Sequence, residues 1–347
     1  MEPEENKLES KPLISVIILA YSRQTFLEDA VNSVFGQTLS SELYEIILVK
    51  NFNNKFTNSL VAEGKIKPVN SNEKGMGAFI RSGIEQSRGD IIVFLEDDDK
   101  WDPARLERVL THFTKYSTLS YYHNSILEID EKGNKLPEPS EFESGKWIGE
   151  ENCILIEDNE KRSVVNKIGK YFPDFNLSSI AISKSVAETV NDFLMDIDTA
   201  VDTFIFFASL GMSGQIILDP AKLTLYRHHS MNQSGSKLGG SDAYLGSLYS
   251  FSSRAIPAYE WAIQFLQTSY PQRGYLIKLA KRRVIFSKLL NSMQNPNINR
   301  VKTLKLALSL LPYVLVFNSE LNIKSLLLGF LYSIWPSYAR IVLASKS

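Results

Sequence analysis

Short, continuous apolar runs recur in the first hundred residues of the chain. Runs of this length that are rich in valine and isoleucine are typical of strands buried on both faces of a sheet. The predicted strands cover residues 13–20, 44–49 and 91–95, with a shorter one at 65–69. The predicted helices between them cover residues 26–34 and 75–86. Strands that alternate with helices predict βαβ units, so we expect an α/β fold with a mostly parallel sheet and flanking helices.

The pattern is less regular in the middle of the chain. Strands are predicted at 118–128 and 215–218, and a helix at 198–210. Residues 234–241 are rich in serine and glycine and have the composition of a flexible linker. The expected organisation is a disordered tail at 1–11, a first domain at 12–235 and a C-terminal helical region at 236–347.

The C-terminal region combines uncharged apolar segments with a strongly positive net charge. Residues 306–317 and 325–339 carry no charge, yet each is shorter than the roughly 18–20 residues that a membrane-spanning helix needs. Residues 275–290 interleave Lys and Arg with leucine and isoleucine, as do helices that lie on an anionic membrane. From residue 273 onward there are twelve Lys or Arg and one acidic residue, in a chain whose net charge is −1. We expect a membrane-associating or oligomerisation region; the alternative is a bundle that packs on the first domain.

Four acidic side chains, residues 96–99, follow the predicted strand at 91–95 directly. Carboxylates clustered at a strand end raise one another's pKa unless a cation lies among them. A divalent metal bound by carboxylate oxygens, with open positions for phosphate, would supply that charge. An acidic turn that faces solvent is the alternative. Asp102 and Pro103 come next and predict the start of a helix, with Asp102 as its N-cap.

Overall composition places few further limits. The length of 347 residues suggests two units, and 44% hydrophobic with 22% charged residues is ordinary for a globular protein. The single cysteine, Cys153, excludes an internal disulfide and fits a reducing compartment. The first ten residues are polar and do not form a signal peptide. We therefore expect a cytoplasmic protein, peripheral on the cytoplasmic face of the membrane.

Several motifs in sequence order resemble those of the family 2 glycosyltransferases, which have the Rossmann-like GT-A fold. The similar segments are residues 15–23, 37–49, 74–90, 96–103 and 226–234, so the resemblance covers about 12–235. Three positions depart from the usual pattern. Lys50 and Asn51 stand where an Asp that recognises the nucleotide base is common, Ser22 replaces Asn, and Glu96 replaces the first Asp of the metal motif.

The resemblance implies transfer of a sugar from a nucleotide-sugar donor with inversion, assisted by Mn²⁺ or Mg²⁺. Asp98 and His229 would bind the metal, and Asp99 and Trp101 would lie on the acceptor side. The implied donor-binding residues are Ala20, Tyr21, Arg23, Asn51, Lys74, Gly75, Glu96, Asp97 and Arg227. The implied acceptor is a lipid-linked saccharide or another glycan, with no role for nucleic acid.

The general base is expected near the start of the predicted helix at 198–210. Asp202 is the first candidate and Asp198 the second, by position in the family pattern. Either residue could instead cap the helix as an ordinary N-terminal acid. An acceptor that is already ionised, such as a phosphate, would need no base.

Other functions remain open at this point. A nucleotidyltransferase also uses carboxylates after a parallel strand, but it should have a glycine-rich loop where this chain has residues 21–23. A dinucleotide-binding fingerprint at Gly75 fails because its third glycine would fall on Ile80. A catalytically impaired, membrane-bound scaffold is the alternative outside enzymes. A homo-oligomer is a further expectation.

Overall fold

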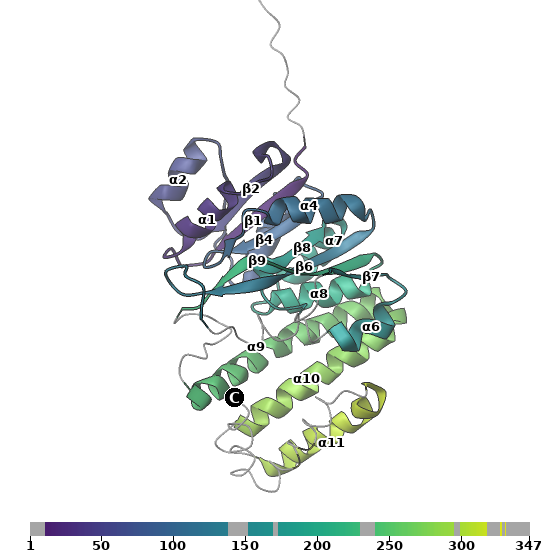
Figure 1. Cartoon of the computed structure of the whole chain (residues 1–347). Helices are drawn as coiled ribbons and strands as arrows, with labels where there is room; N and C mark the ends of the chain where they lie inside the picture. Colours follow the sequence, from purple (N-terminus) through teal and green to yellow (C-terminus); the bar gives the residue numbers. More distant parts are fainter. Residues whose placement is uncertain are drawn as a thin grey trace, which may run out of the picture.

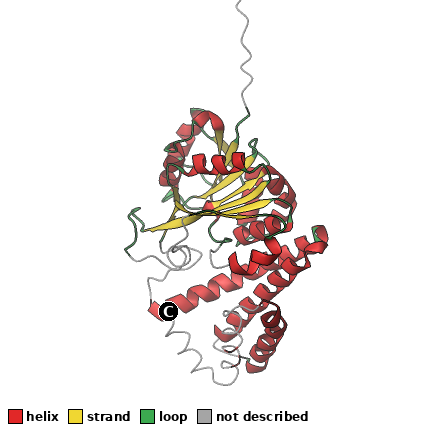
Figure 2. Ribbon diagram, turned by 45° about the vertical axis from the view of Figure 1, so that its right-hand side comes forward, coloured by secondary structure: helices red, strands yellow, loops and turns green. Residues whose placement is uncertain are grey.

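A computed structural model describes residues 11–137, 152–168, 173–229, 240–294 and 299–317, together with Leu327 and Phe330. Within these residues nine strands form one curled, mixed sheet, in the order β3-β2-β1-β4-β8-β6-β9-β5, with β7 paired to β9 (Figures 1 and 2). The predicted α/β class is confirmed. The expected tail at 1–11 and the boundary at 235 fall largely on residues outside this description.

The first half of the sheet is parallel, as the apolar runs predict. Its strands are β1 (Ile14–Ala20), β2 (Tyr44–Lys50), β3 (Lys67–Asn70) and β4 (Ile91–Glu96). β1 pairs in parallel with both β2 and β4, so Ala20 lies beside Lys50 and Leu19 lies beside Glu96. The carboxyl ends of these strands therefore meet at one edge of the sheet.

The second half mixes both directions. Its strands are β5 (Lys100–Trp101), β6 (Leu119–Ile129), β7 (Ile154–Ile156), β8 (Ile180–Ser183) and β9 (Gln215–Arg227). β8 is antiparallel to β4 and to β6, and β6 then pairs in parallel with β9. β9 continues nine residues past its predicted end at 218 and thereby reaches β5.

Helices cover both faces because alternate residues of each strand point to opposite sides. One face packs on α1 (Leu27–Phe35) and α4 (Arg105–Lys115), and its core contains Val16 and Ile18. The other packs on α3 (Met76–Ile84), α7 (Lys184–Leu194) and α8 (Val201–Gly211), and its core contains Ile17 and Leu19. The remaining helices of the first part are α2 (Lys55–Ala62) and α6 (Lys161–Ile168).

The C-terminal helices lie below α8 and extend that second core (Figure 1). They are α9 (Gly240–Ser269), α10 (Gly274–Gln294) and α11 (Arg300–Phe317). Phe265 of α9 and Leu276 of α10 are fully buried in the same cluster as Phe204 of α8. In the part of the chain that is described, no helix is both long and apolar enough to cross a bilayer. The apolar segment at 325–339 lies outside the described residues, apart from Leu327 and Phe330.

Two predicted helix starts are wrong by a few residues. The helix expected to begin at Asp102 and Pro103 begins at Arg105, because Lys100 and Trp101 form β5 and the carboxylate of Asp102 accepts the N–H of Ala104 at 3.0 Å. The helix expected from 198 begins at Val201, because Ala200 has the left-handed φ of 55°.

Candidate functional site

A cavity of about 370 Å³ opens where the carboxyl ends of β1 and β4 meet. Strand ends, the first turn of α8 and one residue of α9 contribute to its wall. The lining residues are Leu19, Tyr21, Ser22, Arg23, Met76, Glu96, Asp97, Asp98, Phe175, Asn176, Leu177, Thr199, Ala200, Val201, Asp202, Tyr226 and Arg254. Predicted donor-side, metal and base residues thus line the same cavity, although they come from distant parts of the sequence.

The acidic residues after β4 surround one cation, Arg23. Its Nη2 lies 2.7 Å from Asp98 Oδ2, and its guanidinium also donates from Nε to Asp97 Oδ1 at 3.0 Å. Burial first, and then the charge of Asp98, raise the pKa of Asp97 to about 7. Burial and the same neighbour raise the pKa of Glu96 well above its ordinary value. The cluster therefore holds more negative charge than Arg23 alone compensates.

His229 approaches the same cluster from the far end of β9. Its Nε2 lies 3.0 Å from Asp98 Oδ2 and 3.3 Å from Nη1 of Arg23. The ring is buried and lies against Phe26, with 5.2 Å between the ring centroids. Asp98 and His229 thus direct an oxygen and a nitrogen at the same point.

The residues present fit the divalent cation that the sequence resemblance implies. Asp98 and His229 offer the carboxylate and imidazole ligands that suit Mn²⁺ and Mg²⁺ chemistry. Asp97 Oδ2 is buried and has no hydrogen-bond partner among the described residues, so the cluster retains an acceptor that a cation would satisfy. In the structure, the guanidinium of Arg23 lies beside Asp97 and Asp98, where the cation would bind.

Arg227, predicted to bind the donor, lies behind the acidic residues and is fully buried. Its Nε donates to the carbonyl of Asp98 at 2.8 Å, and its backbone N–H donates to Asp99 at 3.0 Å. Its Nη2 forms an ion pair with Asp29 of α1 at 2.9 Å. These bonds place Arg227 as a residue that positions the acidic turn.

Asp202 lies in the first turn of α8 and lines the same cavity as Glu96, Asp97 and Asp98. Its Oδ1 accepts the N–H of Thr203 at 2.9 Å. The pKa of Asp202 is raised to about 7, mainly by burial and also by nearby Asp174, while backbone hydrogen bonds oppose the shift. The second candidate base, Asp198, is exposed and packs against Gly75, so it does not line the cavity.

Three residues with left-handed backbone lie at this cavity: Ser22, Asn176 and Ala200, with φ of 60°, 67° and 55°. They are the non-glycine residues with positive φ among those described. Such conformations cost about 1–3 kcal/mol each and cluster at functional sites. Their coincidence with the acidic cluster independently marks the cavity as functional.

The other predicted donor residues surround the cavity at varying distance. Ala20 is buried in β1, and Tyr21 packs edge-to-face on Phe79. Asn51 accepts the backbone N–H of Ser22 at 2.8 Å, which ties the ends of β1 and β2 together. Asn51 is not among the lining residues.

Lys74 is exposed and Gly75 packs against the turn before α8. Gly77 allows this packing, since an added Cβ would lie 2.0 Å from the carbonyl oxygen of Leu194. Neither Lys74 nor Gly75 lines the cavity, whereas the adjacent Met76 does.

The two predicted acceptor-side residues are buried beside the cavity and do not line it. Asp99 accepts a hydrogen bond from Asn176 Nδ2 at 2.8 Å. Trp101 donates from Nε1 to the carbonyl of Ser178 at 2.9 Å, and the guanidinium of Arg105 stacks on its ring. Both side chains connect the acidic turn to residues 176–178.

Lys50 explains how the chain accommodates its departure from the family pattern. Its ammonium is buried and donates to Thr57 at 3.0 Å and to Asn58 at 2.8 Å, both in α2. Burial lowers the pKa of Lys50. The side chain therefore turns into the protein and leaves Asn51 at the exposed strand end.

Sequence reasoning missed several lining residues. Phe175 and Asn176 belong to the irregular middle of the chain, which carried no motif. Arg254 belongs to α9, beyond the predicted domain boundary, and its backbone carbonyl accepts a hydrogen bond from Thr199 at 3.2 Å. No local signal connects Arg254 with the acidic residues in the sequence.

Comparisons with known proteins agree with this arrangement. Residues 15–176 match the family described as glycosyl transferase family 2. The glycosyltransferase alr2836 of Nostoc sp., described as uncharacterized, is 30% identical over 126 residues, 34% of this chain and 38% of that protein. TuaG of Bacillus subtilis, provisionally named a teichuronic acid biosynthesis glycosyltransferase, is 32% identical over 127 residues, 35% of this chain and 50% of that protein. This chain spans between 30% and 59% of the length of the first four curated relatives it matches.

The fold is also similar to that of a solved structure, S. aureus TarS. The match has a TM-score of 0.50 and 11% sequence identity, and it covers 92% of this chain and 55% of that one. At this identity the likeness concerns the fold alone, a curled central sheet with flanking helices and a C-terminal helical region.

Proposed function

Because residues 15–176 match the family described as glycosyl transferase family 2, we propose that the chain transfers a sugar from a nucleotide-sugar donor to an acceptor hydroxyl with inversion. The observation that carries this proposal is one cavity lined by Arg23, Asp98 and Asp202, with His229 in contact with Asp98. It provides a site for an anionic, metal-bound diphosphate next to a carboxylate that can accept a proton. The sugar would lie between the two.

On the donor side, Asp98 and His229 would hold Mn²⁺ or Mg²⁺. Bound there, the cation supplies Lewis-acid stabilisation of the departing diphosphate. Arg23 already pairs with Asp97 and Asp98, and a guanidinium binds phosphate oxygens in the same way. Arg23 would therefore exchange carboxylate for diphosphate when the donor binds.

On the acceptor side, the hydroxyl oxygen would attack the anomeric carbon from the face opposite the diphosphate. A new C–O bond forms, the bond to the diphosphate oxygen breaks with its electron pair, and Asp202 takes the hydroxyl proton. Attack from the opposite face inverts the anomeric centre. A glycan or lipid-linked saccharide is the proposed acceptor class, a choice that the name of TuaG supports.

A screen of nucleotide sugars tests this proposal. The full chain is incubated with each donor and Mn²⁺, Mg²⁺ or excess chelator, and the products are identified. We expect slow hydrolysis of one donor class that releases a nucleoside diphosphate and requires the cation.

The products also separate the alternatives. Release of pyrophosphate would indicate a nucleotidyltransferase, and donor binding without turnover would indicate a scaffold. Equal turnover in chelator would overturn the metal role alone.

We further propose that the C-terminal region contacts an anionic membrane. Half of the exposed large hydrophobic side chains among the described residues lie between 301 and 327. On α11, Val301, Leu308 and Leu311 are exposed together with Lys302 and Lys305. An anionic leaflet attracts each nearby Lys or Arg by about 1 kcal/mol, so the exposed Lys302 and Lys305 favour that partner.

Co-sedimentation with vesicles tests the membrane contact. The full chain is used because α10 buries Leu276 in the shared core, so a truncation would expose that core. We expect binding to phosphatidylglycerol vesicles that weakens in high salt, and at least a tenfold loss in the triple variant V301S/L308S/L311S. The matched control replaces exposed hydrophobic residues elsewhere, Phe35→Ser and Met195→Ser, and should bind normally. A full chain that stays in the supernatant as a tight oligomer would instead identify a subunit interface.

A further inference from the structure

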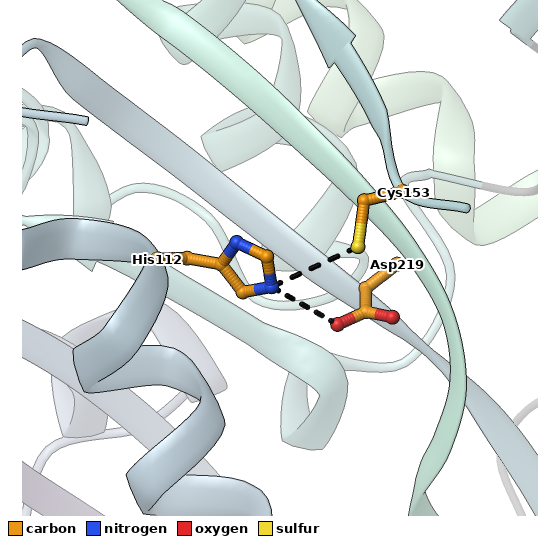
Figure 3. Close-up of side chains that lie close together, drawn as sticks. All are labelled: His112, Cys153 and Asp219. Carbon is orange, nitrogen blue, oxygen red and sulfur yellow. Dashed lines mark hydrogen bonds and ion pairs between the residues drawn. The ribbon is translucent and has the colours of Figure 1, made fainter. Parts of the chain in front are cut away.

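Three side chains that can bind a metal meet where α4 packs on the sheet beside β7 and β9 (Figure 3). His112 comes from α4, Cys153 directly precedes β7, and Asp219 lies in β9. His112 Nε2 is 3.5 Å from Asp219 Oδ2 and 3.7 Å from Cys153 Sγ. None of the three lines the cavity of the proposed transferase.

These separations match a tetrahedral metal site. Zinc binds sulfur at about 2.3 Å and histidine nitrogen or carboxylate oxygen at about 2.0–2.2 Å. Tetrahedral angles with these bonds place neighbouring ligand atoms about 3.3–3.7 Å apart. The two distances from His112 therefore need adjustments of only a few tenths of an ångström, and all three ligand atoms lie within 4.8 Å of one another.

We propose that His112, Cys153 and Asp219 form a zinc site that ties the edge strand β7 to α4. Thiolate and imidazole select borderline-soft cations such as Zn²⁺ over Mg²⁺ or Mn²⁺. The acidic cavity offers mainly carboxylate oxygens, so ligand type separates the two cation sites. This proposal does not depend on the transferase activity.

The local structure prepares two of the ligands. The His112 ring lies beside Tyr122 and Tyr116, with centroids 5.5 Å and 6.5 Å away, which restricts its orientation. Asp219 is fully buried; burial alone would raise its pKa, but hydrogen bonds from His112 and Arg108, among others, hold that pKa well below the ordinary value. The carboxylate is therefore ionised and directed at the cluster.

Cys153 would bind the metal as a thiolate. Burial first, and then the charge of Asp219, raise the pKa of the thiol to about 11. A coordinated metal ionises a thiol outright, so metal binding would release its proton. The same burial and negative charge that disfavour a free thiolate favour one bound to a divalent cation.

Arg108 competes for this position. Its Nε lies 2.6 Å from Asp219 Oδ2, and its Nη2 lies 3.0 Å from Oδ1 and 3.6 Å from the Cys153 sulfur. Its side chain is 42% exposed, so the guanidinium can move into solvent or keep only its bond to Oδ1. Zinc and Arg108 would thus bind Asp219 Oδ2 in alternation, and removing Arg108 should strengthen metal binding.

A cobalt titration of the metal-free full chain tests the site. Cys153 is the single cysteine of the chain, so a near-ultraviolet charge-transfer band between sulfur and Co²⁺ can arise from no other side chain. We expect this band to saturate at one Co²⁺ per chain and to disappear when Zn²⁺ is added. Arg108→Gln should bind Co²⁺ at least fivefold more tightly than the unmodified chain.

Variants distinguish a metal site made by three side chains from metal binding by Cys153 alone. Cys153→Ser should abolish the band, and His112→Gln should weaken Co²⁺ binding at least tenfold, with circular dichroism checking the fold. Asp98→Ala should keep the band, because it alters only the acidic cavity. Absence of the band from both the unmodified chain and Arg108→Gln, or unchanged affinity in His112→Gln, would overturn the proposal.

Discussion

Replacing Asp98 with alanine is expected to lower sugar transfer by about 10²–10⁴-fold and to leave the fold intact. Oδ2 of Asp98 contacts both Arg23, at 2.7 Å, and His229, at 3.0 Å, so the carboxylate connects the proposed phosphate-binding and metal-binding side chains. Charge stabilisation of a leaving group at such a site is worth several kcal/mol, and each 1.4 kcal/mol is tenfold in rate. Turnover of the donor identified in the screen, with and without Mn²⁺, measures the effect.

The fold should tolerate this change for an electrostatic reason. Burial first, and then the charge of Asp98, raise the pKa of both Asp97 and Asp99 to about 7, so the charge of Asp98 opposes ionisation of its neighbours at neutral pH. A carboxyl whose pKa is raised by folding destabilises the folded state once the pH exceeds its ordinary pKa. Removing Asp98 relieves part of this cost, and the midpoint of thermal unfolding should stay the same or rise.

Glu63→Ala is the matched control for the Asp98 variant. Glu63 is an exposed acid that pairs with the nearby Lys65 at 2.7 Å, and it is not among the residues that line the cavity. Its replacement should change neither turnover nor binding of Mn²⁺ measured by electron paramagnetic resonance. Full activity of the Asp98 variant would show that the acidic cluster is not the donor site.

The first half of the fold could be predicted from the sequence because its strands are buried on both faces. The predicted strands 13–20, 44–49 and 91–95 agree with β1, β2 and β4 to within one residue at each end. β8 and β7 are short and have no pattern of their own. They form strands only because β4 and β9 provide partners for their backbone groups.

The candidate site could also be predicted only in part from the sequence. The acidic residues could be identified directly, since they interrupt an apolar strand, and the family resemblance suggested His229 and Asp202. The sequence could not predict whether a long side chain at a strand end points into the cavity or into the protein interior. Lys50 is directed inward by Thr57 and Asn58 of α2, a helix that the pattern did not predict.

Replacing Asp202 with asparagine is the second large effect that we expect. Asparagine keeps the shape and the hydrogen bond from Thr203 but cannot accept a proton, so turnover should fall by about 10²–10⁴-fold. Donor affinity should change little, because the donor diphosphate would bind at Asp98 and Arg23. Single-turnover rates and donor titrations measure the two quantities separately.

The pH profile gives an independent check on Asp202. Its pKa is raised to about 7, so the carboxylate is protonated and inactive as a base below that pH. The rate should therefore increase tenfold per pH unit below about pH 7 and level off above it, and the asparagine variant should lose this dependence. Asp198→Asn is the matched control, since Asp198 is exposed and does not line the cavity. If Asp198→Asn lost as much activity as Asp202→Asn, or if Asp202→Asn lost donor affinity in proportion to rate, Asp202 would be a structural acid of the α8 helix and not the base.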